Sequence, residues 1–429
     1  MPQTSADSFS MPTIQGLQLE YEGSVKNVFS NPAEPNYLWF QFTDDYSVFD
    51  WGKMPDEIAN KGKSLTLLGA YLFGELAEPA FWAQLPRSPH LKKFSSDYLD
   101  QRWQHLSFSG DEGLARTGLT SHFVALVDIN RNTLPLNIDT LTQYAGKDAL
   151  LKVLRAQVNR PSPKLLFGQN IYFYNAENFS PWSKRLIPLE VVFRFGMGKG
   201  SSLSKRLHDD PHYIHQLGFP AKPAPGEWFD HPVLEFFSKL EPKDRFVSWQ
   251  EATMLSGLNA ALFEELAETA IDIALALHHL FAEKGLELWD GKLEFILQPS
   301  KGSGDSEQEA KILLADSIGP DELRLVYRGQ QISKEFIRQY YRNTSWAKSL
   351  EKALEIAGEE PGRDWKDICL HDLKEAPPHL SSQMKWAADR LYGCVANQVI
   401  GRNIFADQPS LDQLVSALDT ALSATDGKD

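Results

Sequence analysis

The N-terminal part of the chain changes from strand-like to helix-like spacing of its apolar residues. Residues 17–29 and 37–42 alternate between apolar and polar side chains and are rich in valine and aromatic residues, which predicts strands. From 64 to 76, leucines recur at intervals of three or four residues, which predicts a helix with Ser64 as a candidate cap. The chain is therefore expected to open with strands followed by a helix.

The middle of the chain is broken by proline-rich segments such as LPRSPH and NRPSPK. Within it, residues 122–129 predict one strand. Residues 187–195 predict another, because β-branched and aromatic residues dominate them. The glycine-rich sequence GMGKGSS follows at once and predicts a loop whose backbone amides can face a ligand.

A long helix is predicted in the second half of the chain. Ser248 and Glu251 form a capping-box pattern, and apolar residues then continue at helical spacing from Met254 to Phe281. Gly285 supplies a C-terminal stop. His278 and His279 are adjacent, so they cannot both face one ligand, and we expect one to pack inside and the other to lie at the surface.

The remaining pattern gives two strands and then helices. Residues 286–297 and 311–318 predict paired strands, and helices are predicted near 333–342, 345–357, 380–400 and 409–423. Strands and helices do not alternate regularly, which indicates a mixed α+β fold rather than a parallel βαβ array.

Composition limits the classes of function. The 429 residues carry a net charge of −14, so a broad surface for nucleic acid or an anionic membrane is not expected, and any phosphate must be held by a local basic cluster. Cys369 and Cys394 are too few for a disulfide framework, which favours a cytoplasmic protein. Neither a signal sequence nor a run of 18 apolar residues is present, so a membrane partner is not expected, whereas a homo-oligomer remains compatible with the sequence.

Acidic residues on the paired strands form the most informative pattern. Asp290, Lys292 and Glu294 are two residues apart on one predicted strand and therefore share a face. If the strands pair as a hairpin, Asp316 lies close to Glu294, and two carboxylates in one cleft suit Mg²⁺ bridged to nucleotide phosphates. The alternative interpretation is an ordinary solvated face of an antiparallel hairpin.

Basic and hydroxyl residues form a second pattern around the glycine-rich loop. Guanidinium groups bind phosphate in bidentate fashion, and a Gly/Ser loop adds hydroxyl and amide donors, so this cluster predicts a sugar-phosphate site, although an exposed basic turn would have the same composition. The residues are Arg194, Lys199, Ser201, Ser202, Lys205, Arg206, Arg324 and Arg338. A third pattern, Gly23 to Lys26 between two strands, places a lysine where it could cover nucleotide phosphates.

These patterns occur together and in order in the SAICAR synthetase family, which this chain resembles. LEYEGSVKNVF resembles the family's YEGKAKxVY, and FTDDYSVFD with NKGKSL resembles the acidic and Gly-Lys segment that follows. IPLEVVFRFGMGKGSSLSKRL resembles IPLEVVVRNxAAGSLxKRL, LELWDGKLEFIL resembles LVDFKLEFG, and ILLADSIGPDELRLV resembles LxDExSPDxxRLW. SKEFIRQYY resembles the DKDRFRxxL segment.

The resemblance implies a two-lobed fold and a set of roles. The expected fold has an N-terminal antiparallel sheet lobe with an atypical insertion (17–185), a central substrate and metal lobe (186–345) and a C-terminal helical region (346–429). The implied enzyme is an ATP- and Mg²⁺-dependent ligase that joins aspartate to carboxyaminoimidazole ribonucleotide through an acyl phosphate. The resemblance implies that Gly23 and Lys26 contact the nucleotide and that Glu294 and Asp316 bind the metal. It implies that the ribonucleotide is held by Arg194, Ser201 or Ser202, Lys292 and Arg324. Asp321 and Arg338 are expected in the same cleft and, with Lys292, are the implied catalytic residues, whereas Asp244 and Asp290 are further candidates.

The chain also departs from the family pattern. Ser24 stands where the family has a first lysine, Ser317 follows Asp316 where the family has a glutamate, and most of 79–185 finds no counterpart beyond GLTSHFV. Two alternatives therefore stay open: a paralogous ligase that uses another carboxylate or amine, and a non-catalytic relative that binds a nucleotide or a protein.

Overall fold

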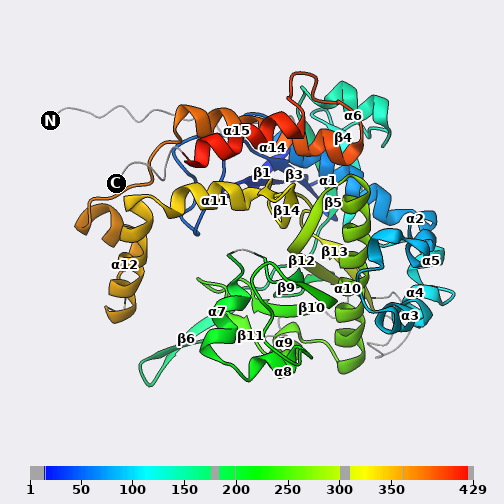
Figure 1. Cartoon of the computed structure of the whole chain (residues 1–429), viewed down its shortest axis with the longest axis horizontal. Helices are drawn as coiled ribbons and strands as arrows, with labels where there is room; N and C mark the ends of the chain where they lie inside the picture. Colours follow the sequence, from blue (N-terminus) through cyan, green and yellow to red (C-terminus); the bar gives the residue numbers. More distant parts are fainter. Residues whose placement is uncertain are drawn as a thin grey trace.

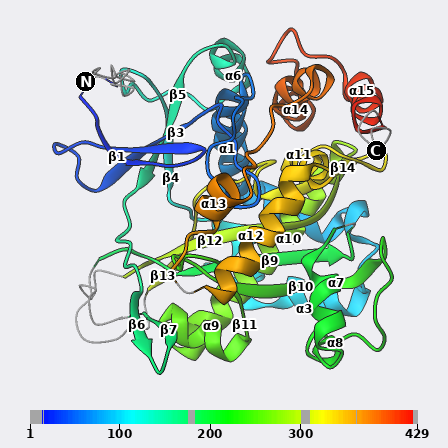
Figure 2. The ribbon, with the colours of Figure 1, turned by 90° about the vertical axis from the view of Figure 1, so that its left-hand side faces the viewer.

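The computed structural model describes residues 14, 16–174, 183–198, 200–299, 310–360 and 362–423. Two antiparallel sheets form the frame of these residues, one in the N-terminal lobe and one in the central lobe (Figure 1, Figure 2). Helices pack on both sheets, and Figure 2 shows the N-terminal sheet above the central one. The chain is thus a two-lobed α+β protein, as the sequence predicts.

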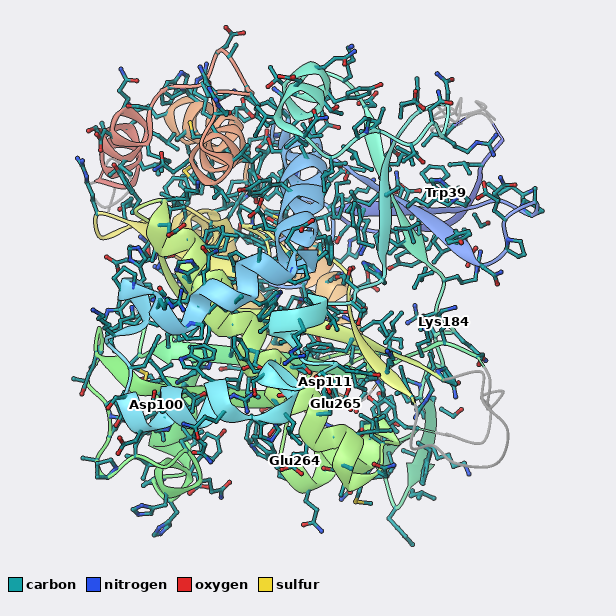
Figure 3. The ribbon with its side chains drawn as sticks, turned by 90° about the vertical axis from the view of Figure 1, so that its right-hand side faces the viewer. Trp39, Asp100, Asp111, Lys184, Glu264 and Glu265 are labelled. Atoms are coloured by element: carbon teal, nitrogen blue, oxygen red, sulfur yellow. The ribbon has the colours of Figure 1, made fainter. Side chains whose placement is uncertain are left out.

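The N-terminal sheet has five strands. The predicted strand region 17–29 is a hairpin of two strands that turns at residues 23–25, and its partner strand holds the fully buried Trp39 (Figure 3). In order across the sheet the strands are β1 (Gln18–Glu22), β2 (Lys26–Ser30), β3 (Tyr37–Phe42), β5 (Ala149–Leu154) and β4 (Phe123–Asp128).

The central sheet is organised by one twelve-residue strand, β12 (Glu287–Gln298). It pairs antiparallel with β9 and β14 over its first half and with β13 and β8 over its second half. The other strands are β8 (Arg185–Leu186), β9 (Leu189–Gly196), β10 (Trp228–Ser238), β11 (Phe246–Val247), β13 (Lys311–Ala315), β14 (Leu323–Tyr327) and β15 (Gln330–Gln331). A separate hairpin of β6 (Ser162–Leu166) and β7 (Gln169–Phe173) projects from the body (Figure 1).

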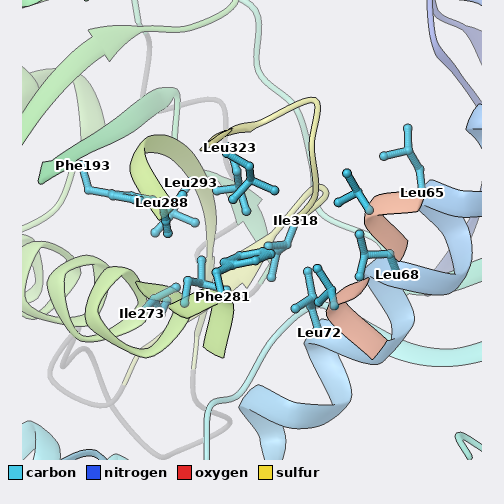
Figure 4. Close-up of a cluster of buried hydrophobic side chains, with 14 of the residues drawn as sticks. Leu65, Leu68, Leu72, Phe193, Ile273, Phe281, Leu288, Leu293, Ile318 and Leu323 are labelled. Carbon is cyan, nitrogen blue, oxygen red and sulfur yellow. The ribbon is translucent and has the colours of Figure 1, made fainter. Parts of the chain in front are cut away.

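The two lobes share one hydrophobic core. Leu68 and Leu72 from the N-terminal lobe pack toward Phe281, Leu293 and neighbouring side chains of the central lobe (Figure 4). The helices are α1 (Lys61–Ala77), α2 (Pro79–Gln84), α3 (Ser96–Gln104), α4 (Leu106–Ser109), α5 (Leu114–Thr117), α6 (Ile138–Tyr144), α7 (Ser202–Asp209), α8 (Tyr213–Gln216), α9 (Trp249–Ser256), α10 (Ala260–Glu283), α11 (Lys334–Arg342), α12 (Ser345–Glu359), α13 (Trp365–Asp367), α14 (Ser382–Ile400) and α15 (Leu411–Ser423). None of these helices, within the described ranges, has the length and apolarity needed to cross a bilayer.

Three sequence predictions about helices are wrong. The expected long helix is two helices, because Gly257 adopts a left-handed φ of 62° and Asn259 caps a new start. Ser64 does not cap α1, which begins one turn earlier at Lys61, and Ser64 is buried inside it. His278 and His279 are both buried, because α10 is covered by neighbours around most of its circumference.

The other helix predictions are confirmed within a few residues. The Ser248 cap accepts a hydrogen bond from the Glu251 amide, and α10 ends just before Gly285, whose φ is 74°. α11, α12, α14 and α15 lie where the apolar spacing predicts helices. α14 packs against α1, and α15 packs against α14, so these two helices lie against the N-terminal lobe.

Candidate active site

Strand β12 carries charged side chains to two neighbouring places. Asp290 stands opposite Arg194 of β9 and Arg324 of β14, whereas Glu294 stands opposite Ala315, the residue before Asp316. The strand rises about 3.3 Å per residue, so Asp290 and Glu294 are separated by about 13 Å along it. Two clusters are therefore held at a fixed spacing by one strand.

The first cluster, which we call the arginine cluster, is built around Arg194. Its guanidinium group is buried, with Nε 2.5 Å from Glu235 Oε2 and Nη1 3.1 Å from Asp290 Oδ2. The same group donates to the hydroxyls of Ser201 at 3.3 Å and Ser202 at 3.2 Å. Both serines begin α7, and Ser201 is its N-cap, so the glycine-rich loop brings hydroxyls and a helix N-terminus to one guanidinium.

The arginine cluster continues on β14 and α11 through Glu335. Arg324 donates to Asp290 Oδ2 at 2.6 Å, and its other terminal nitrogen lies 3.7 Å from Glu335. Arg338 and Arg342 lie 3.4 and 2.6 Å from the same carboxylate, and both are partly exposed. With Arg206, which pairs with Glu235, the described part of the cluster has five guanidinium groups against three carboxylates. That excess of two positive charges suits a phosphate dianion.

The second cluster, the carboxylate–lysine cluster, contains Glu294 and Asp316. Burial and the neighbouring Asp316 carboxylate raise the pKa of Glu294. Burial acts in the same direction on Asp316, but the ammonium groups of Lys26 and Lys239 lower the pKa of Asp316 well below its usual range. Lys26 comes from β2 of the other lobe, forms an ion pair with Asp316 and lies 4.3 Å above the ring of Phe40.

Two further lysines complete this cluster. Lys239 Nζ lies 2.7 Å from Glu294 Oε1, and Lys292 Nζ lies 2.7 Å from Glu190 and 3.2 Å from Glu322. Burial would raise the pKa of Glu190, but the two lysines lower it overall. Of the residues described in this cluster, three ammonium groups face four carboxylates, so the balance here is negative.

A divalent cation fits this balance. Mg²⁺ in nucleotide sites is usually held by one or two carboxylates and by substrate phosphates, and Glu294 and Asp316 can supply the carboxylate oxygens. Over the ranges that the structure describes, no group of three or more His, Cys, Asp or Glu side chains is arranged to hold a metal ion unaided. Phosphate oxygens would therefore have to supply part of the coordination.

The loop that carries Lys239 is held from outside the cluster. Leu240 has a φ of 73°, an unfavourable value for a branched residue. The hydroxyl of Tyr174, at the foot of the β6–β7 hairpin, lies 2.9 Å from both the Lys239 carbonyl oxygen and Glu241 Oε1, and it shares its one proton between these two acceptors. This contact holds the backbone carbonyl before Leu240 and the side chain of the residue after it.

Asp321 lies in a buried network between the lobes. Its carboxylate accepts a hydrogen bond from Tyr392 of α14 at 2.5 Å, and Lys61 at the start of α1 lies 2.9 Å away. Burial would raise the pKa of Asp321, but Lys61 and Lys334 lower it far below its usual range. The network joins three parts of the chain, which is a structural role. These contacts do not test the role expected for Asp321 in the substrate cleft, and that role remains a prediction.

The other predicted residues fall at the edges of the two clusters. The Gly23 amide bonds to the Lys26 carbonyl at 2.9 Å, and an added Cβ at Gly23 would lie 2.6 Å from that oxygen, so the turn requires glycine. Asp244 interacts electrostatically with Glu190, and burial and this carboxylate raise its pKa to about 6. Lys205 lies on α7, and Lys199 lies outside the described residues.

Sequence reasoning missed several members of the clusters. Glu190 lies four residues before Arg194 on β9 and therefore shares its face of the strand. The available signal for Glu190 was that it is a single acidic residue in an otherwise largely apolar strand. Glu235 is likewise the one acid in PVLEFFS, within a strand that was not predicted. Glu335 and Lys239 carried no distinguishing local pattern.

Comparison with known proteins agrees with the fold. A sequence model of the family described as SAICAR synthetase matches residues 19–99 and 150–353. A putative phosphoribosylaminoimidazole-succinocarboxamide synthase of Archaeoglobus fulgidus is 28% identical over 404 residues, which cover 93% of this chain and 99% of that protein. The phosphoribosylaminoimidazole-succinocarboxamide synthase of Thermoplasma volcanium is 25% identical over 394 residues, 90% of this chain and 99% of that protein.

A solved structure shows the same fold. The SAICAR synthase of Saccharomyces cerevisiae, determined in complex with SAICAR, superposes with a TM-score of 0.51 at 19% identity, covering 92% of this chain and 98% of the yeast chain. The family match covers more than half of the chain and includes both clusters. The chain belongs to the SAICAR synthetase family.

Proposed function

We propose that this protein is an ATP-dependent ligase that forms the amide bond between aspartate and carboxyaminoimidazole ribonucleotide. The observation that carries the proposal is the pairing of a positive and a negative cluster on one strand face. The arginine cluster suits a phosphate, the carboxylate–lysine cluster suits a metal-bound nucleotide, and β12 holds them about 13 Å apart. The relatives named above are synthases of the same succinocarboxamide.

The arginine cluster would hold the ribonucleotide by its phosphate. Arg194 is already fixed by Glu235 and Asp290, so it is preorganised, and Ser201 and Ser202 present hydroxyls beside it. Arg324 would bind the phosphate from the opposite strand, and the more exposed Arg338 would close the cleft from α11. A bidentate fork on each side gives orientation as well as charge.

The carboxylate–lysine cluster would hold ATP. Lys26 enters from the N-terminal lobe and would contact the phosphates beside the turn at Gly23, while Glu294 and Asp316 would hold Mg²⁺. Mg²⁺, when bound, would neutralise charge on the transferring phosphoryl group. For these contacts Lys26 and Lys239 must exchange part of their present ion pairs for phosphate oxygens.

Positioning would account for most of the catalysis. A carboxylate oxygen of the ribonucleotide attacks the γ-phosphorus of ATP, and the bond to ADP breaks, giving an acyl phosphate. The aspartate amine then attacks the acyl carbon, phosphate leaves, and the nitrogen releases a proton. Lys292, between the clusters, would stabilise the negative charge of the carboxylate and of the departing phosphate, and no covalent protein nucleophile is needed.

A direct assay tests the proposal. The protein is incubated with ATP, Mg²⁺, aspartate and carboxyaminoimidazole ribonucleotide, and ADP and the succinocarboxamide are measured together. We expect the two products in equal amounts and neither product when the ribonucleotide is omitted. ADP formation that requires a different amine or carboxylate would point to a paralogous ligase, and absence of ADP with every pair would contradict the proposal.

A further inference from the structure

His122 makes a buried contact with the backbone of the acidic cluster. Its ring Nε2 lies 2.9 Å from the carbonyl oxygen of Asp316, and because a carbonyl only accepts, Nε2 must carry the proton. The imidazole is packed between the rings of Phe40 and Phe73, at centroid distances of 5.7 and 5.6 Å. Only 3% of the residue is exposed, so water cannot easily replace this hydrogen bond.

The backbone of the same residue joins the two lobes. The His122 amide donates to the Leu314 carbonyl at 2.8 Å, and the His122 carbonyl accepts from the Leu154 amide at 2.7 Å. Leu314 belongs to β13 of the central lobe and Leu154 to β5 of the N-terminal sheet. The backbone of His122 is thus fixed by hydrogen bonds to both lobes, and its side chain extends from this fixed point to Asp316.

Asp316 needs such a support because its backbone is in an unfavourable conformation. Its φ is 61°, in the left-handed region, immediately after β13 ends at Ala315. The Asp316 carboxylate lies close enough to Glu294 to interact with it electrostatically, since Glu294 is paired with Ala315, the residue before the turn. A residue in this region keeps its conformation only when its surroundings determine it.

We propose that His122 is a positioning residue that holds the Asp316 backbone in its left-handed conformation, and thereby sets the cation affinity of the Glu294–Asp316 pair. The inference rests on the proposed function, because it assumes that these carboxylates bind a divalent cation together with a nucleotide. His122 does not touch the reacting groups. It acts through a carbonyl one bond from the Asp316 Cα.

The test uses side chains that reproduce one ring nitrogen or the other. The amide nitrogen of glutamine reaches about as far as Nε2, whereas that of asparagine reaches only as far as Nδ1. We would therefore compare His122→Gln and His122→Asn in the full-length protein. The readout is the dissociation constant of Mn²⁺ in the presence of ADP, followed by the electron paramagnetic resonance signal of free Mn²⁺, so it does not depend on turnover.

The expected result is a difference between the two variants. Supporting contacts to a metal ligand typically change affinity 10- to 100-fold, so His122→Asn should weaken Mn²⁺ binding at least about tenfold, and His122→Gln should stay within about twofold of the wild type. His279→Gln is the matched control. Its amide nitrogen does not reproduce the ring Nδ1 that lies 2.8 Å from Ser88 Oγ, so the change removes another buried imidazole contact and should lower the thermal midpoint without changing Mn²⁺ affinity.

Two results would overturn the inference, and only one of them would also contradict the metal assignment in the proposed function. If the wild type binds Mn²⁺ with ADP and both His122 variants bind it equally well, or lose affinity equally, His122 has no positioning role while the metal site stands. If the wild type itself fails to bind Mn²⁺ with ADP, the metal assignment in the proposed function fails as well. The thermal midpoints show that each variant is folded.

Discussion

The two clusters on β12 differ in where their parts come from. The described members of the arginine cluster lie on β9, β10, β12, β14, α7 and α11, all within the central lobe. The carboxylate–lysine cluster depends in addition on Lys26 from β2 and on the His122 contact from the N-terminal lobe. One cluster is therefore complete within a lobe, whereas the other exists only when the two lobes are together.

The two clusters also differ in how freely their charged groups can move. Arg194 is enclosed by carboxylates that fix its orientation, so the positive site is rigid before any ligand binds. In the negative site the lysines are the components that can move, because a flexible stem carries each ammonium group. We expect substitutions in the first cluster to weaken ribonucleotide binding and substitutions in the second to impair nucleotide use.

The strongest test of this comparison is Glu294→Gln. The amide keeps the shape but removes the charge that would hold a cation, and charge stabilisation by a metal ion is worth several kcal/mol, so kcat should fall roughly a thousandfold. Glu287→Gln, an exposed position on the same strand, is the matched control and should keep full activity. Steady-state assays of both variants would measure this; a Glu294→Gln enzyme with normal kcat would remove the metal assignment.

Arg324→Met should have the second largest effect, and on a different parameter. Truncation of one partner of a desolvated charge pair costs about 2–5 kcal/mol, and four other guanidinium groups remain, so KM for the ribonucleotide should rise roughly thirtyfold with little change in KM for ATP. Arg328→Met, at an exposed arginine paired with Asp412, is the control. If KM for ATP rose instead, the division of roles between the clusters would be wrong.

The pH dependence of the free energy of unfolding tests a buried contact with β12, the strand that both clusters share. His278 of α10 hydrogen-bonds to the Leu288 backbone of β12, and burial, with help from the Lys93 ammonium, lowers its pKa to about 3. Between pH 6.5 and about 3 the unfolded chain binds this proton and the folded chain does not, so the free energy of unfolding should fall as the pH falls. Between pH 6.5 and 5.5 the loss from this group is at most about 1.4 kcal/mol.

Denaturant unfolding at several pH values would measure this loss. In His278→Gln that part of the pH dependence should disappear, whereas the wild type should retain it. An identical pH dependence of the free energy of unfolding in both proteins would show that His278 does not determine how much stability the protein loses in acid.

The smallest expected effect comes from Tyr174→Phe. Loss of its hydroxyl removes the hydrogen bonds that fix the Lys239 loop, at a cost of about 1 kcal/mol in the free energy of unfolding. Because Lys239 serves only the carboxylate–lysine cluster, KM for the ribonucleotide should not change. A denaturant titration and two KM measurements would test this, and a raised ribonucleotide KM would count against the separation of the clusters.

Local patterns in the sequence predicted the parts of the site that lie on β12. The two-residue spacing of Asp290, Lys292 and Glu294 fixes a common face, and the hairpin with β13 brings Asp316 beside Glu294, as expected. The pattern could not show which face is buried. That depends on the helices packed behind it, and their positions are set by contacts distant in sequence.

The missed residues have a common cause. Glu235 and Glu335 matter because each lies among arginines from other elements, and nothing in their own neighbourhood signals this. The break at Gly257 was missed because the apolar spacing continues across it, although a glycine followed by an asparagine two residues later was a usable sign. Roles for individual residues came from family resemblance rather than from local pattern.

The single strand beneath both clusters also limits how the molecule can open. Asp290 and Glu294 cannot change their separation without stretching β12, whose neighbours bond to it along its whole length. The lobes are also joined by one hydrophobic core, which holds the N-terminal sheet in place against the central lobe. Under the proposed function, adjustment to a bound nucleotide therefore falls to the flexible lysine side chains, Lys26 among them, while the carboxylates beneath stay at their fixed spacing.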